Sequence, residues 1–299
     1  MDTNHLQCFV TAADAGSMTR AAQRLDISQP ALSARIRRLE EQIGAPLFER
    51  LPRGITPTDT GWLMLPLARR ALAGLRDVES ALVGAAHRRF AFGAIPTVAP
   101  MAGPAAVGRL REAGAEQIQV IEDFTTELIC RVLAGELDAA IVSTPLDAQG
   151  LNVEEIGVEP FVVAVSQNHP LADSLSLGVP DLRGAPAVAL NDMHCLDRQL
   201  NAFCTLRHLT MPVVCTTAQV GTLLEMVAAN VGVAIVPRMF QRLGDSGRVR
   251  FVPMKRGSGS RTLALLRRST CRAPELDAAL RAAVRDALEE QPTLGRRVS

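Results

Sequence analysis

Hydrophobic residues in the first part of the chain recur every three or four positions, which is the spacing of amphipathic helices. Three such stretches follow one another, and the apolar face of the third consists of Leu32, Ile36, Leu39 and Ile43. Gly16 marks the end of the first helix, and Ser17 and Ser28 are typical capping residues for the second and third. Only a few residues separate the second helix from the third, so the two are expected to cross steeply as a helix-turn-helix.

A hairpin and then a long helix are predicted after these three helices. Pro52, Arg53 and Gly54 form a turn between two short extended stretches, which is typical of the wing in a winged helix-turn-helix. We therefore expect a mainly α winged helix-turn-helix domain in residues 1–58 and a long helix in residues 59–88.

The long helix carries apolar residues at close to a heptad spacing. They are Leu67, Ala71, Leu75, Val78 and Leu82. This stripe could pack on the helix's own domain, but no second apolar face is available to close a separate domain. We predict a linker helix that dimerises with a second copy of the chain and that is kinked at Pro66.

From Phe90 onward, short β-rich runs alternate with helical stretches. The predicted strands are residues 92–95, 117–121, 139–142, 161–165, 213–216 and 233–236. The predicted helices are residues 104–113, 125–134, 195–207 and 220–230. This alternation predicts an α/β domain in residues 89–299 with a mainly parallel sheet.

Composition narrows the range of functions only in part. The chain has 299 residues, of which 47% are hydrophobic, and a formal net charge of +1, so attraction to nucleic acid would come from local patches. No apolar run approaches the roughly 18 residues of a membrane span, and the start lacks the pattern of a secretory signal, so we expect a cytoplasmic protein. The six cysteines form no CxxC motif and no cluster with histidine, and we expect no metal site and no cofactor.

The third helix carries polar residues outside its apolar face that are suited to reading DNA. A helix in the major groove contacts base edges with its N-terminal residues and phosphates further along. Gln29 and Ser33 are therefore candidates for base edges, and Pro30 can pack on a thymine methyl group. An ordinary solvated helix explains the same spacing equally well. The predicted DNA-binding residues are Thr19, Ser28, Gln29, Pro30, Ser33, Arg35, Arg37, Arg38, Arg50 and Arg53.

The chain resembles the LysR family of transcriptional regulators along most of its length. The matching stretches are residues 17–22, 27–33, 47–50, 56–58, 135–141, 168–172 and 231–237. The resemblance implies a regulator of double-stranded DNA, not an enzyme, with an effector domain of two α/β lobes hinged like a periplasmic binding protein. It also implies a homotetramer. In this assembly, a shift in the relative placement of the DNA-binding units would change the contact with RNA polymerase.

Cys195 and Cys204 lie nine residues apart on one predicted helix. Their Cα atoms would be about 13 Å apart at 1.5 Å per residue, whereas a disulfide needs about 4.4 to 6.8 Å. The two thiols can therefore join only if the helix unwinds, which would make them a two-state switch. The helix start, with His194 and Arg198 beside it, favours a thiolate at Cys195 that peroxide can oxidise.

Two buried structural cysteines are the simpler alternative for this pair. Cys130 and Cys215 fall inside predicted elements, and we expect both to lie in the core. A thiol enzyme with His194 as the base is disfavoured, because no third residue that would orient the base is apparent.

Residues 192–204 resemble the sensing loop of the OxyR-type peroxide sensors within the LysR family. This resemblance implies that Cys195 is the peroxidatic thiol and Cys204 the resolving thiol of a reversible disulfide. It also implies a peroxide pocket formed by Thr97, Thr125, His194 and Arg268. A regulator that binds a small anionic metabolite between the lobes stays an alternative, and loss of the response in a Cys204→Ser variant would argue against it.

Overall fold

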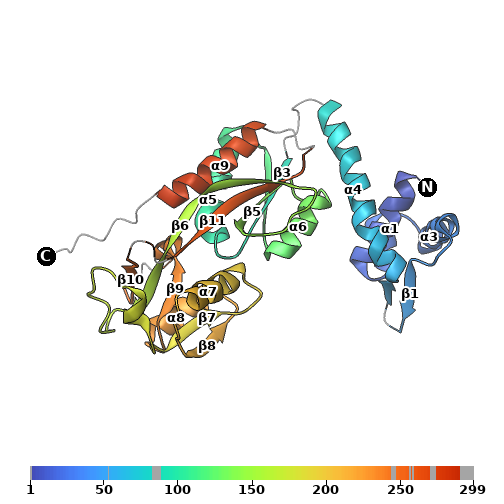
Figure 1. Ribbon diagram of the computed structural model, residues 1–299. Helices are drawn as coiled ribbons and strands as arrows, with labels where there is room; N and C mark the ends of the chain where they lie inside the picture. The colour runs from blue at the N-terminus through green and yellow to red at the C-terminus, as the bar shows by residue number, and fades with distance from the viewer. Residues whose placement is uncertain are drawn as a thin grey trace. The chain divides into compact units, whose positions relative to one another are not determined.

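The computed structural model describes residues 2–52, 54–82, 89–243, 247–255, 257, 259–269 and 274–289 (Figure 1). The chain divides into two compact units, one built mainly from residues 1–86 and the other mainly from residues 87–299. The two units are described separately below. None of the helices in these described ranges is long and apolar enough to cross a membrane.

The first unit contains the predicted helices and hairpin. Its elements are α1 (Thr3–Ala15), α2 (Met18–Arg24), α3 (Gln29–Ile43), β1 (Phe48–Leu51), β2 (Gly54–Pro57) and α4 (Asp59–Leu82). Gly16 ends α1 in a left-handed conformation with φ 58°. The hydroxyl oxygens of Ser17 and Ser28 accept hydrogen bonds from the N–H groups of Arg20 and Ala31, so the three predicted helix boundaries are confirmed.

The core of this unit joins the helices to the hairpin. Phe9, Leu32, Leu39 and Leu47 are completely buried within it. β1 and β2 pair antiparallel, as predicted for the wing. A carboxylate oxygen of Glu40 accepts hydrogen bonds from the N–H groups at residues 47 (2.8 Å) and 48 (3.4 Å), which fixes the point where the wing leaves α3.

α4 carries apolar residues on two different faces. Leu65, Ala68 and Leu72 belong to the core of the first unit. The predicted stripe lies on another face, where Leu67 is 61% and Val78 55% exposed. The stripe is therefore not packed on its own unit in the described part of the chain, and the helix continues through Pro66.

The second unit is the α/β domain. Its strands are β3 (Arg89–Ala94), β4 (Gln117–Glu122), β5 (Ala139–Thr144), β6 (Asn152–Ser166), β7 (Ala187–Leu190), β8 (Val213–Thr217), β9 (Ala234–Pro237), β10 (Val249–Pro253) and β11 (Ser260–Arg267). Its helices are α5 (Ala99–Glu112), α6 (Thr125–Leu133), α7 (Cys195–Leu206), α8 (Val220–Ala228) and α9 (Pro274–Glu289), with short 3-10 helices η1 (Val179–Leu182) and η2 (Arg238–Arg242).

The large sheet has the strand order β10-β6-β11-β5-β3-β4, and β9 also pairs with β6. Within the described part of the chain, the β3–β4 and β3–β5 pairs of this sheet are parallel, and its other pairs are antiparallel. The prediction of a mainly parallel sheet is therefore wrong. The reason is that β10 and β11, which were not predicted, both pair antiparallel with β6, and β11 also pairs antiparallel with β5.

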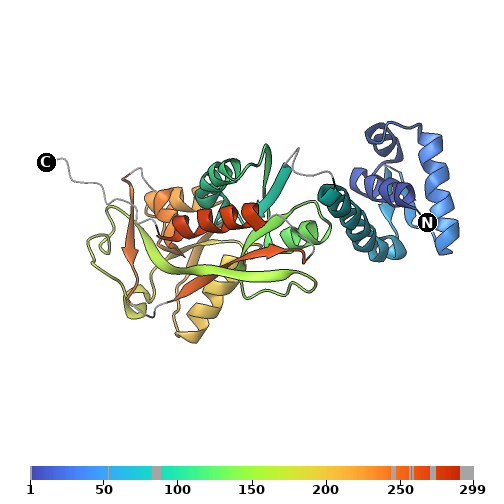
Figure 2. The ribbon, with the colours of Figure 1, turned by 90° about the horizontal axis from the view of Figure 1, so that it is seen from above.

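β6 passes through both lobes of the domain (Figure 2). Its first part, up to Pro160, pairs with β11, and its second part pairs with β9 and β10. We call the part with β3, β4, β5, β11, α5 and α9 lobe I, and the part with β7, β8, β9, β10, α7 and α8 lobe II. The predicted architecture of two hinged α/β lobes is confirmed.

Close backbone packing at Gly232 gives a test of lobe II. The N–H of Val233 donates to the carbonyl of Pro186 (2.8 Å), and a Cβ at Gly232 would lie 2.6 Å from that same oxygen. We predict that Gly232→Ala lowers the free energy of unfolding by about 1 to 3 kcal/mol, because the two backbone segments must separate.

Thermal unfolding of the purified protein measures this loss. Gly108→Ala is the matched control, because it lies inside α5 and a Cβ there meets nothing within 4 Å. The control should be unchanged or more stable by about 0.5 to 1 kcal/mol. Equal unfolding temperatures for the two variants would contradict the prediction.

Candidate functional site

The two cysteines predicted to form the redox pair lie on a single intact helix. Cys195 is the first residue of α7, and Cys204 lies near the end of the same helix. Both thiols are free and half-buried. Nine residues of helix hold their Cα atoms about 13 Å apart, so a disulfide cannot form while α7 keeps its helical shape.

His194 connects the start of α7 to the start of α6. The residue is 2% exposed, and its Nε2 atom lies 2.8 Å from the carbonyl oxygen of Ala218. The ring also makes an edge contact with Phe124, with ring centroids 5.1 Å apart. Phe124 directly precedes α6, so the contact brings His194 of lobe II close to the segment that holds Thr125.

Thr125 is buried at the first position of α6, and its hydroxyl oxygen has no hydrogen-bond partner among the described residues. Buried hydroxyl groups almost always have a partner, which can be a water or a ligand. The Thr125 hydroxyl is thus available to a small polar molecule beside the start of α7.

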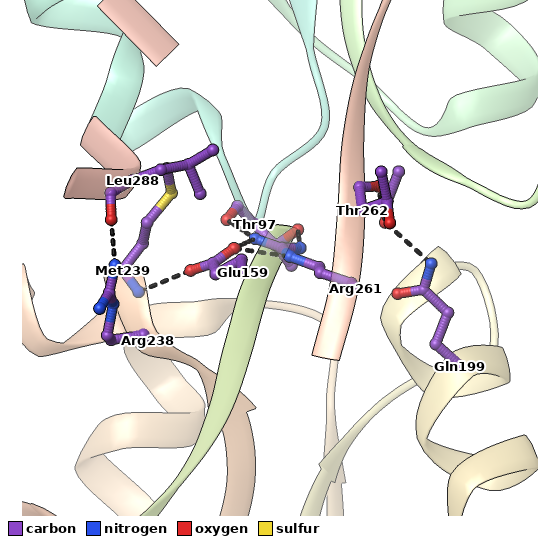
Figure 3. A network of polar contacts seen from close by, with 9 residues as sticks. Thr97, Glu159, Gln199, Arg238, Met239, Arg261, Thr262 and Leu288 are labelled. Carbon is purple, nitrogen blue, oxygen red and sulfur yellow. Dashed lines mark hydrogen bonds and ion pairs between the residues drawn. The ribbon is translucent and has the colours of Figure 1, made fainter. Parts of the chain in front are cut away.

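Thr97, in contrast, is held by protein groups. Its hydroxyl oxygen accepts a hydrogen bond from Arg261 (2.6 Å), and its backbone carbonyl accepts a second one (3.0 Å). Arg261 also forms an ion pair with Glu159 (2.7 Å), and both charged side chains are 0% exposed. The second carboxylate oxygen of Glu159 accepts from the N–H of Met239 (2.6 Å), as Figure 3 shows.

The prediction that Arg268 lies with Thr97, Thr125 and His194 is wrong. Thr97 and Thr125 follow the carboxyl ends of β3 and β4, and parallel β5 ends at this same edge of the sheet with Thr144. β11 runs antiparallel to β5, with residue 262 opposite residue 144 and residue 267 opposite residue 139. Arg268 therefore follows the far end of β11, about 20 Å of strand away from Arg261.

Sequence reasoning missed Arg261 and Glu159, although a signal for them exists. Each directly precedes an apolar run, residues 160–165 after Glu159 and residues 262–266 after Arg261. Charged residues are almost never fully buried unless they are paired. The direction of β11 in the sheet decides that Arg261, and not an arginine at the other end of the strand, reaches Thr97. The other strand arginine, Arg267, instead pairs with Asp277 (2.9 Å) and Glu154 (3.5 Å).

Gln199 is a further polar residue of the site that sequence reasoning missed. Its side-chain N–H group donates to the hydroxyl of Ser143 and to the carbonyl of Thr144, both at 2.8 Å. These acceptors end β5 in lobe I, whereas Gln199 lies on α7 of lobe II. The amide thus connects the helix with the two cysteines to the other lobe.

A cavity of about 630 Å³ lies beneath α7, between this helix and the β7–β8 sheet. Its wall includes Leu196, Leu200 and Cys204, which follow one another at four-residue spacing along the inner face of α7. Cys195 is not part of this wall. The two thiols of the predicted pair therefore face different surroundings.

Burial changes the acidity of two groups on α7. It raises the pKa of the Cys204 thiol above its ordinary value. It also raises the pKa of Asp197, and the nearby carboxylate of Asp192 adds to that increase. At neutral pH, Cys204 is accordingly held in its protonated, weakly nucleophilic form while α7 is intact.

The other cysteines differ from one another in exposure. Cys130 is exposed on α6, so the prediction that it lies in the core is wrong, because it occupies the outer side of that helix. Cys215 is half-buried, Cys8 is buried, and a guanidinium nitrogen of Arg35 lies 3.8 Å from the Cys8 sulfur. Cys271 lies outside the described residues.

The predicted DNA-binding residues lie on the surface of the first unit. The exposed ones are Thr19, Ser28, Gln29, Pro30, Arg35, Arg37, Arg38 and Arg50, and Ser33 is half-buried. On α3, the Gln29 amide donates to the Ser33 hydroxyl (3.3 Å), and Arg37 donates to the Ser33 carbonyl (3.4 Å). Arg53 lies outside the described residues.

Comparisons with known proteins agree with this arrangement. Residues 3–62 match the bacterial regulatory helix-turn-helix of the lysR family, and residues 84–289 match the LysR substrate binding domain. A hydrogen peroxide-inducible genes activator of Haemophilus influenzae is 30% identical over 277 residues, which is 90% of this chain and 91% of the relative.

Two solved structures share the fold over nearly the whole chain. A full-length OxyR of Pseudomonas aeruginosa, with one cysteine replaced by aspartate, superposes with a TM-score of 0.81 and is 26% identical, covering 98% of this chain and 99% of that protein. A hydrogen-peroxide-bound OxyR of Corynebacterium glutamicum, with one cysteine replaced by serine, gives a TM-score of 0.64 at 26% identity, covering 96% and 94%.

A winged helix-turn-helix joined to a two-lobed α/β domain defines a DNA-binding transcriptional regulator with an effector domain. The chain belongs to the LysR family of these regulators, and it is not an enzyme.

The raised pKa of Cys204 leads to a pH-dependent prediction. Alkylation by iodoacetamide follows the thiolate fraction, so a thiol with a raised pKa reaches a given rate of alkylation at a higher pH than an ordinary thiol does. We predict that Cys204 of the reduced, folded protein is alkylated slowly at neutral pH, with its rate increasing at higher pH than in the protein unfolded in urea. Mass spectrometry of the labelled peptides measures both rates. An inflection in the folded protein at or below that of the unfolded protein would contradict the prediction.

Proposed function

We propose that this LysR-family regulator senses hydrogen peroxide through a reversible disulfide between Cys195 and Cys204. The observation that carries the proposal is that both thiols lie on α7, at a separation that the intact helix cannot close. The dithiol and the disulfide therefore require different folds of the same segment, and oxidation would be converted directly into a conformational change.

The chemistry proceeds in two displacement steps. The Cys195 thiolate attacks one oxygen of peroxide, the O–O bond breaks, and a sulfenic acid forms as the other oxygen leaves and takes a proton to become water. The Cys204 sulfur then attacks the sulfenic sulfur, which forms the S–S bond and releases a second water. Two thiols and one peroxide thus give one disulfide and two waters.

The start of α7 supports Cys195 as the thiol that reacts first. Cys195 occupies the first position of α7, directly after His194, whose ring contacts the segment that holds Thr125, whereas Cys204 lies in the wall of the cavity beneath the helix. The raised pKa of Cys204 leaves that thiol protonated until the helix opens. The order of the two steps follows from this difference.

We assign the polar groups next to Cys195 to the binding of peroxide. The Thr125 hydroxyl has no partner among the described residues and suits a small hydroxylic ligand, and the His194 ring lies beside the same segment. Thr97 takes part with its position fixed by Arg261, which replaces Arg268 in our assignment. The relatives named for peroxide, one of them peroxide-bound, support this ligand over a metabolite.

We further propose how the regulator engages double-stranded DNA. Gln29 and Ser33, near the N-terminal end of α3, would contact base edges, with Pro30 on a thymine methyl group and Thr19 and Ser28 at the backbone. Arg35, Arg37, Arg38, Arg50 and Arg53 would bind phosphates or guanine. Arg35 also contacts Cys8, so it would help to hold α3 on α1.

The functional division that we propose is a DNA-binding domain in residues 1–58, a dimerising linker helix in residues 59–88 and a sensor domain in residues 89–299. The exposed stripe on α4 supports dimerisation, because a row of exposed apolar residues on a helix is typical of a helix that pairs with a partner. We propose a homotetramer that acts in the cytoplasm and whose oxidation changes its contact with RNA polymerase.

Peroxide titration tests the proposed function. We expect one equivalent of hydrogen peroxide to convert the reduced protein to a Cys195–Cys204 disulfide, with a changed DNA footprint, as measured by peptide mass spectrometry and footprinting. Cys204→Ser should leave a dimedone-reactive sulfenic acid at Cys195 and an unchanged footprint. Cys130→Ser is the matched control, because it removes an exposed thiol outside the pair, and it should behave like the wild type. Slow oxidation spread over several cysteines would refute peroxide sensing and favour a metabolite as the signal.

A charged residue in the exposed stripe tests the linker. We predict that Leu67→Glu weakens self-association at least tenfold, because the carboxylate would be buried between two apolar helices. Analytical ultracentrifugation over a range of concentrations measures this change. Leu175→Glu is the control, since Leu175 is 95% exposed in the second unit and outside the stripe. Unchanged association in Leu67→Glu would exclude this face of α4 as the dimer contact.

A further inference from the structure

Gln199 forms a direct polar link between the two lobes. One side-chain N–H group reaches both the Ser143 hydroxyl and the Thr144 carbonyl, each at 2.8 Å. The Ser143 hydroxyl in turn donates to the carbonyl of Thr262 (3.0 Å), and Ser143 is buried. Figure 3 shows Gln199 extending from α7 toward the start of β11. A single amide thus attaches α7 directly to β5 and, through the Ser143 hydroxyl, to β11.

The position of Gln199 on α7 makes this link dependent on the state of the thiols. Gln199 comes four residues after Cys195 and five before Cys204. To form a disulfide, the two Cα atoms must approach from about 13 Å to within about 7 Å, so the helical turns between them must unwind. Because Gln199 lies within those turns, its contacts with Ser143 and Thr144 belong to the dithiol form.

Other contacts hold α7 at both of its ends. The start is fixed by His194, and the far end by Phe203, whose ring packs at 6.4 Å from that of Phe161. Between them, Leu196 and Leu200 face the cavity of about 630 Å³. Leu196 is also buried in the core. The link made by Gln199 adds a polar contact with lobe I to this apolar packing in the middle of the helix.

We propose that Gln199 is a positioning residue that stabilises the dithiol form and ties the lobe arrangement to the state of the two thiols. This inference rests on the proposed Cys195–Cys204 switch. A contact present in only one of two states shifts the equilibrium toward that state. Removing the Gln199 link should therefore favour the disulfide, and it should also release α7 from lobe I in the reduced protein.

The equilibrium between dithiol and disulfide tests this directly. The full-length protein is equilibrated in glutathione buffers of graded ratio, so that two glutathione thiols reduce the protein disulfide and form one glutathione disulfide. Alkylation followed by mass spectrometry then measures the dithiol fraction. This equilibrium does not involve peroxide, so an effect of Gln199 on peroxide binding cannot produce the result.

Gln199→Leu keeps the approximate size of the side chain but removes the donor. We expect its equilibrium to shift about tenfold toward the disulfide, which is a midpoint potential about 30 mV more negative. Ser143→Ala should shift it in the same direction by less, because the Thr144 carbonyl still accepts. The double variant should match Gln199→Leu alone, since the serine contributes through the amide.

Asn201→Ala is the matched control. Asn201 lies on the same helix, but its amide donates to Asp197 (2.8 Å) within α7, and it has no hydrogen bond to lobe I among the described residues. Its equilibrium should stay within about twofold of the wild type. Circular dichroism establishes that each variant is folded, and if Gln199→Leu is not, the smaller shift in Ser143→Ala decides the question.

The outcomes separate the two proposals. A wild-type protein that forms no Cys195–Cys204 disulfide at any glutathione ratio would overturn the proposed switch together with this inference. A normal wild-type disulfide whose equilibrium is unchanged by Gln199→Leu, or changed equally by Asn201→Ala, would overturn the role of Gln199 alone. A tenfold shift confined to the Gln199 and Ser143 variants would establish it.

Discussion

The ion pair between Glu159 and Arg261 is the constraint on which the effector domain depends most. Both side chains are completely buried where β6 passes from one lobe to the other. Ionised groups are stable in such a place only when their hydrogen bonds are satisfied, and loss of one partner typically costs about 3 to 5 kcal/mol. Glu159 also holds the backbone of Met239, and Arg261 holds Thr97. The pair thereby fixes the ends of β3 and β9 relative to β6 and β11.

The candidate sensor site follows from this junction. Thr97 is positioned by Arg261. Thr125 begins α6, shortly after the neighbouring strand β4 ends at the same edge of the sheet. α7 reaches that edge from lobe II through His194 and Gln199. Because the contacts come from both lobes, a change in the fold of α7 alters the connection between the lobes. A local thiol reaction can therefore become a change in the shape of the whole effector domain.

The two units of the chain use apolar surface in different ways. In the effector domain, the apolar strands of both lobes are covered by helices, and the inner face of α7 lines a cavity. In the first unit, α4 places Leu65 and Leu72 in the core and leaves Leu67 and Val78 exposed. A helix with one apolar face in its own core and another open to solvent is suited to joining two copies while it remains part of each.

The sequence by itself determined the features that depend on neighbours along the chain. Gly16, Ser17 and Ser28 set the helix boundaries through their own backbone conformation and hydroxyl groups, so the helix-turn-helix could be predicted closely. The spacing of Cys195 and Cys204 on one helix was equally local. Peroxide as the signal came from resemblance, not from these spacings.

Only the tertiary structure decided which distant residues meet. The antiparallel pairing of β11 places Arg261 at Thr97 and sends Arg268 to the opposite edge, although both arginines belong to one short stretch of sequence. Periodicity also could not show that Cys130 faces outward or that Gln199 reaches Ser143. Strand direction and lobe contacts come from burial and pairing summed over the whole chain, and no local pattern of residues records them.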